Sequence, residues 1–75
     1  MQTFERLVQI LEEYVEVDEI KAEDNFKLDL GMSSFDTMCL ANDIEDTFGV
    51  SLKAADFVNN KTVGDMASYL NKVCA

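Results

Sequence analysis

The chain contains no histidine and no proline, and only three of its 75 residues are glycine. Because proline and glycine break helices, their scarcity favours an all-helical fold over strands joined by tight turns. Without histidine the chain lacks the commonest general base, and no nucleophile is paired with another base, so we expect no enzyme activity and no catalytic residues. The two cysteines, Cys39 and Cys74, lack the spacing of metal ligands, so we expect free thiols and no metal site.

Basic residues are also scarce: six lysines and arginines face 15 aspartates and glutamates, which gives a formal net charge of −9. This charge excludes nucleic acid as a partner, because phosphate backbones are repelled, and it attracts basic patches on other proteins. No apolar run reaches membrane-spanning length, and the first residues lack the pattern of a signal peptide. We therefore expect a monomeric cytoplasmic protein, without membrane insertion, that forms a single domain over residues 1–75.

Apolar residues recur at helical spacing in three segments and suggest a fourth, shorter helix. We expect a first helix from Phe4 to about Val15, with Thr3 as its cap. Residues 54–60 offer only one apolar turn, so they are predicted to form a short third helix. The last helix should begin after the cap Thr62, and its predicted buried stripe consists of Val63, Met66, Ala67, Leu70 and Val73.

A long connection separates the first two helices. Residues 16–33 show no sustained period, yet four apolar residues are spaced like the anchors of an ordered loop: Ile20, Phe26, Leu28 and Leu30. A loop of this length in a small domain normally has a packing or functional reason, and here it would let the first two helices pack in an up-down-down arrangement. The sequence thus predicts an all-α four-helix bundle of three longer helices and a short third helix, with a long first loop.

The start of the second helix, predicted over residues 34–48, carries the clearest local signals. Ser33 is placed to cap the helix, Asp36 completes a capping-box pattern, and Gly49 is expected to end the helix in a left-handed conformation. Ser34 then stands in the exposed first turn, where free N–H groups and the positive end of the helix dipole stabilise an anion. By this local pattern alone, Ser34 is an ordinary helix-start serine.

Three segments together resemble, in order and spacing, the acyl carrier protein family. They are residues 30–37 (LGMSSFDT), 44–50 (IEDTFGV) and 62–65 (TVGD). Ile20, Phe26, Asp29 and Leu30 also match the first loop of the family, so the resemblance covers essentially the whole chain. Three matches in register are far more specific than any one of them.

The resemblance implies a carrier whose Ser34 bears a covalent 4′-phosphopantetheine arm, attached by a phosphopantetheinyl transferase. The thiol of the arm would hold acyl groups as thioesters and deliver them to the separate enzymes of type II fatty acid biosynthesis. A carrier for polyketide, nonribosomal peptide or other specialised assembly is the alternative. The family usually has Asp-Ser-Leu where this chain has Ser33, Ser34 and Phe35, so Ser33 is the rival attachment position. Ser33 and Asp36 are otherwise expected to shape the helix start.

Two further sets of residues follow from this interpretation. Acyl-transferring and chain-elongating enzymes with basic docking patches are expected to contact the second helix, at Phe35, Met38, Asp43, Glu45 and Asp46. An apolar space that receives the acyl chain is expected beside that helix, lined by Ile44, Phe57, Val58, Val63 and Ala67.

Small size, acidic charge and helical spacing are also typical of two other classes of protein. An EF-hand is excluded, because a calcium loop that began at Asp24 would place Phe26 and Leu28 at ligand positions. A non-carrier helical interaction module remains the alternative from another class, since a helix-start serine and an acidic surface are also ordinary features of a solvated protein.

Overall fold

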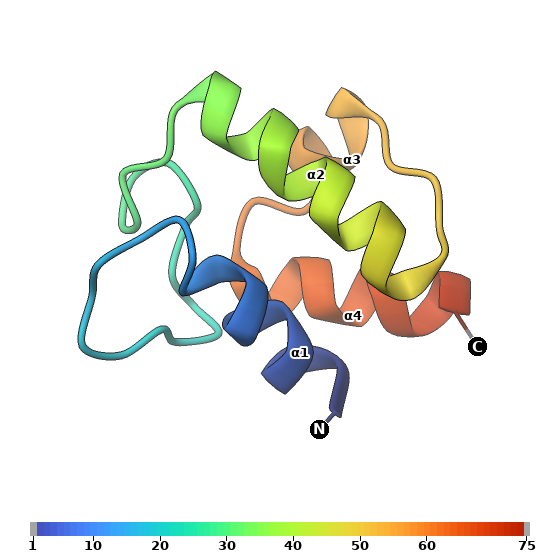
Figure 1. The fold of residues 1–75 in the computed structure, drawn as a ribbon, viewed down its shortest axis with the longest axis horizontal. Helices are drawn as coiled ribbons and strands as arrows, with labels where there is room; N and C mark the ends of the chain where they lie inside the picture. The colour runs from blue at the N-terminus through green and yellow to red at the C-terminus, as the bar shows by residue number, and fades with distance from the viewer. Residues whose placement is uncertain (1, 75) are drawn as a thin grey trace.

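The computed structural model describes residues 2–74 and contains four helices: α1 (Gln2–Leu11), α2 (Ser34–Phe48), α3 (Ala54–Asn59) and α4 (Val63–Cys74). Helix α1 packs against both α2 and α4, while the long connection between α1 and α2 forms the left side of the molecule in Figure 1. Over the described residues there is no strand, and only an isolated bridge joins Asn25 and Thr62. The predicted all-α bundle with one short third helix is confirmed.

Three helices supply the centre of the core. Its largest fully buried side chains come from α1, α2 and α4 and are Leu7, Leu11, Leu40, Ile44, Val63, Met66 and Leu70. The long connection adds three more apolar side chains from outside the helices: Phe26, Leu30 and Met32. The connection is therefore part of the hydrophobic core and does not merely link two helices.

Helix α1 differs from the prediction at both ends. It begins at Gln2, so Thr3 lies inside the helix and its hydroxyl donates to Oδ1 of Asn71 on α4, at 2.5 Å. It ends at Leu11, after which Tyr14 N–H donates to the Leu11 carbonyl in a tighter turn, at 2.8 Å. The acidic Glu12 and Glu13 follow directly and the last turn has no basic residue, and both features disfavour further helix at its negative end.

The long connection is held against the start of α4 by backbone hydrogen bonds. Phe26 N–H donates to the Lys61 carbonyl at 3.1 Å, and Val63 N–H donates to the Asp24 carbonyl at 3.0 Å. Gly64 N–H donates to the Ala22 carbonyl at 2.8 Å. These bonds satisfy N–H groups in the first turn of α4 and fix Phe26 in the core.

Two apolar residues that were expected to be buried are exposed. Leu28 is 85% exposed, because the side chain of Asn25 accepts the N–H groups of Lys27 and Leu28 and turns this segment toward solvent. Val73 is 45% exposed, because the last turn of α4 reaches the edge of the bundle (Figure 1). Met32, which the spacing did not single out, is buried instead.

The contact between Gly64 and the connection generates a stability prediction. A Cβ atom added at Gly64 would lie 3.0 Å from both the Cβ and the carbonyl oxygen of Ala22. Alanine favours a helix over glycine by about 1 kcal/mol, whereas overpacking costs about 1–3 kcal/mol, so we expect Gly64→Ala to lower the free energy of unfolding by about 1 kcal/mol. Urea unfolding measures this. Ser68→Ala, on an exposed position of α4, is the control and should be neutral or slightly stabilising; a Gly64→Ala protein at least as stable as the wild type would contradict the packing described.

Candidate functional site

The first residue of α2, Ser34, has an exposed side chain. Its hydroxyl has no hydrogen-bond partner among the described residues, while its carbonyl oxygen accepts the hydroxyl of Thr37 at 2.8 Å. Gly31, three residues earlier, has a φ of 68°, the left-handed region that a residue without a side chain adopts at little cost. The chain thus turns at Gly31 and enters the helix with the Ser34 hydroxyl facing solvent.

The neighbouring serine is used differently. The Ser33 hydroxyl accepts the N–H of Asp36 at 3.1 Å, and the Asp36 carboxylate accepts the N–H of Ser33 at 3.0 Å. This reciprocal capping box was predicted and is confirmed, as is the left-handed Gly49 (φ 69°) at the other end of the helix. Of the two adjacent hydroxyls, the one on Ser33 is committed to the fold and the one on Ser34 is free.

The start of α2 suits a phosphate group on Ser34. The backbone N–H groups of Ser34 and Phe35 have no acceptor among the described residues, and they lie at the positive end of the helix dipole. The nearest carboxylate in sequence, that of Asp36, is turned back onto Ser33 N–H. A phosphodiester at Ser34 would therefore meet two free donors.

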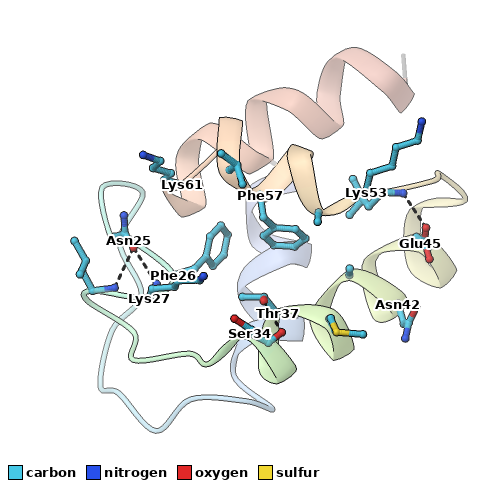
Figure 2. A pocket seen from close by; sticks show the side chains of 16 residues that line it. Asn25, Phe26, Lys27, Ser34, Thr37, Asn42, Glu45, Lys53, Phe57 and Lys61 are labelled. Carbon is cyan, nitrogen blue, oxygen red and sulfur yellow. Dashed lines mark hydrogen bonds between the residues drawn. The ribbon is translucent and has the colours of Figure 1, made fainter.

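A cavity of about 780 Å³ opens beside Ser34, between the long connection, α2 and α3 (Figure 2). The rings of Phe26 and Phe57 both line it and contact each other edge to face, with centroids 5.6 Å apart. Its apolar lining further includes Leu28, Met38, Ala41, Leu52, Ala54 and Val58. Its volume falls within the range of small-molecule pockets, which is about 300–1,000 Å³.

Only part of the expected acyl-chain lining faces this cavity. Phe57 and Val58 line it, whereas Ile44, Val63 and Ala67 are buried in the core and do not. The reason for this difference is physical: helical periodicity identifies an inward face without telling which part of that face another helix covers. Ile44, Val63 and Ala67 pack against other core side chains. The cavity is lined instead by α2 residues such as Met38 and Ala41 and by the long connection.

The predicted docking residues divide into two groups. Phe35 and Met38 are 70% and 67% exposed, and Asp46 is also exposed, so these three are accessible near Ser34 or along α2. The carboxylates of Asp43 and Glu45 make contacts within the chain. Both residues lie on α2, and their sequence spacing gave no sign of these internal contacts.

Those internal contacts brace α2 at two points. The Glu45 carboxylate accepts the N–H of Leu52 at 2.8 Å, across the connection to α3. The Asp43 carboxylate accepts the hydroxyl of Tyr14, just beyond α1. This hydrogen bond, together with partial burial and the negative charge of Asp43, raises the pKa of Tyr14 to about 12, so the hydroxyl stays protonated as a donor throughout the neutral range.

The cysteines lie outside the start of α2. Cys39 and Cys74 are free thiols. Within residues 2–74, no helix is sufficiently long and apolar to cross a bilayer, and no three acidic or cysteine side chains gather in a way that could hold a metal ion.

Comparison with known proteins agrees with this geometry. Residues 5–70 match the family model described as a phosphopantetheine attachment site. The chain is 39% identical over 71 residues to the acyl carrier protein of Thermotoga maritima, an alignment that covers 92% of this chain and 88% of the relative. It is also 40% and 42% identical, over 55 residues, to the acyl carrier proteins of an Exiguobacterium species (strain AT1b) and of Exiguobacterium sibiricum; each alignment covers 73% of this chain and 70% of the relative.

The family match spans most of the chain, and both the helical fold and the helix start that carries a free serine hydroxyl agree with it. The chain therefore belongs to the acyl carrier protein family, whose members bear a covalent 4′-phosphopantetheine and act as carriers, not as enzymes.

Proposed function

We propose that Ser34 is the attachment residue for the arm and that the protein shuttles acyl intermediates between the enzymes of type II fatty acid biosynthesis. The observation that carries this proposal is the free, exposed hydroxyl of Ser34 at the first turn of α2, next to a serine whose hydroxyl is already engaged. An ester at Ser34 leaves the capping box intact. The same modification at Ser33 would remove the hydroxyl that caps the helix.

Ser33 and Asp36 are positioning residues in this proposal. They hold the helix start, so that the N–H groups of Ser34 and Phe35 stay free next to the modified residue. When bound, the arm supplies a flexible chain that ends in a thiol, and this thiol holds the acyl group as a thioester. The protein itself keeps the attachment point exposed and offers the neighbouring cavity to the acyl chain, with Phe57 and Val58 on its α3 side.

Proteins of this family meet a phosphopantetheinyl transferase and biosynthetic enzymes. We propose that these partners contact Phe35 and Met38 as apolar anchors beside Ser34. Basic patches on the partner enzymes would be attracted to the acidic side chains of α2. Asp46 is the acidic residue of the predicted set that is exposed, while Asp43 and Glu45 contribute charge from positions that also brace the helix. Weak, reversible contacts of this kind suit a cytoplasmic shuttle that leaves each enzyme after one step.

A carrier for a specialised assembly pathway is the second candidate. The observation in its favour is local: Ser33 stands where the family usually has an aspartate, and Cys39 stands on α2 where the family commonly has an acidic residue. Identification of the acyl group on protein isolated from its own cell decides between the two pathways.

Intact-mass measurement after co-expression with a phosphopantetheinyl transferase tests the attachment site. The wild type should gain one phosphopantetheine, and Ser34→Ala should gain none. Ser33→Ala is the matched control: it should keep the gain, although loss of its cap lowers stability by about 1 kcal/mol. A gain that persists in Ser34→Ala would refute the assignment, and a wild type that gains nothing with several transferases would favour the non-carrier interaction module.

Sheltering of the acyl chain can be tested by NMR. When octanoyl-loaded protein is compared with the unacylated holo protein, amide shifts should change at Ala41, Phe57 and Val58, which line the cavity. Ser68, on an exposed position of α4, should be unaffected. If the three cavity residues keep their shifts, the acyl chain does not enter this space.

A further inference from the structure

The charges around the cavity differ in sign from the rest of the chain. Three of the five lysines, Lys27, Lys53 and Lys61, line it, whereas the whole chain has a net charge of −9. They come from three separate places: the long connection, the residue before α3 and the segment between α3 and α4. No sequence pattern links them, and only the fold brings them to one opening.

These lysines have no electrostatic partner within the described part of the chain. Their side chains are exposed and make no ion pair or hydrogen bond there, and Figure 2 shows Lys53 and Lys61 on opposite sides of Phe57 with their amino groups directed outward. Glu45 is the acidic residue of the lining, and its carboxylate already accepts the Leu52 N–H. The opening therefore presents positive charge that the fold does not use.

The interior and the rim of the cavity have different chemistry. The interior walls are apolar, with Phe26 and Phe57 in contact, and suit methylene groups. The lysines keep their amino groups in water at the rim while their aliphatic stems extend the apolar lining. A chain with a methyl end would gain nothing from these charges. A carboxylate at the far end of a chain would gain from them, and at the rim it avoids the cost of burial.

We propose that the carrier is adapted to acyl groups that end in a carboxylate, with methylene groups in the cavity and the terminal carboxylate at the rim formed by Lys27, Lys53 and Lys61. This inference rests on the proposed function, because it requires an acyl chain on Ser34. It goes further by naming the class of cargo, a dicarboxylic acid attached through one of its two ends. The phosphodiester of the arm is the other anion that could meet the lysines, and the experiment separates the two.

The test uses full-length protein loaded from the corresponding coenzyme A thioesters with suberoyl or octanoyl arms. The terminal carboxyl carbon of the suberoyl group is isotopically labelled, and an NMR titration gives the pKa of this carboxyl group on the protein. At low ionic strength the pKa should be about 0.5 unit higher in Lys53→Gln/Lys61→Gln than in the wild type, because the positive charges that favour the ionised form are gone. The difference should shrink in high salt.

Lys21→Gln/Lys72→Gln is the matched control, because it removes the same charge from exposed lysines that do not line the cavity. It should shift the carboxyl pKa by much less. Equal shifts in the two variants would overturn the proposal, since they would report net charge alone. A phosphorus resonance that moves in octanoyl-loaded Lys53→Gln/Lys61→Gln, with no change in the suberoyl pKa, would also overturn it and assign the lysines to the arm.

Failure of this inference is distinct from failure of the proposed function. Intact mass shows directly whether the arm is loaded. If the protein loads normally but the lysine substitutions leave the carboxyl pKa unchanged, the carrier function stands and only the cargo assignment fails. If the protein accepts neither the suberoyl nor the octanoyl arm, both the carrier function and the cargo assignment fail.

Discussion

The reciprocal hydrogen bonds between Ser33 and Asp36 are the interaction on which the functional site depends. They end the long connection and begin α2 at one defined residue, so that the Ser34 hydroxyl stands free at the positive end of the helix. Each of the two bonds satisfies a backbone N–H that would otherwise lack a partner. A helix that frayed here would lose both the position of the hydroxyl and the donors that can receive a phosphate.

The cavity depends on a second set of contacts, those that hold the long connection to the start of α4. The backbone bonds from Phe26 and Gly64 keep this segment in place, and Phe26 contacts Phe57 of α3 in the lining of the cavity. The same arrangement brings Lys27 and Lys61 to its rim. The connection thus acts as a wall of the bundle, which explains how a chain of 75 residues with four helices can have a sizeable pocket next to its helix start.

Local signals predicted the parts of this structure that neighbouring residues determine. The bounds of α2, its capping box, the left-handed Gly49 and the cap by Thr62, which accepts Asp65 N–H at 3.1 Å, were all readable because they involve residues within one turn. The burial of Val63 and Ala67 away from the cavity depends on contacts between distant segments. The early end of α1 and the exposure of Leu28 have local causes, but the apolar spacing by itself favoured a longer helix and a buried Leu28. Periodicity assigns a face to a helix but cannot say what covers it, and it also gave no sign of the lysine rim.

The central claim is that one particular hydroxyl, that of Ser34, bears the arm. The most direct measurement is fragmentation mass spectrometry of the peptide spanning residues 28–53, taken from protein isolated in its loaded form, because this peptide contains both adjacent serines. The account predicts that the fragment series places phosphopantetheine on Ser34 and leaves Ser33 unmodified. An arm on Ser33, or on any residue outside this peptide, would contradict it.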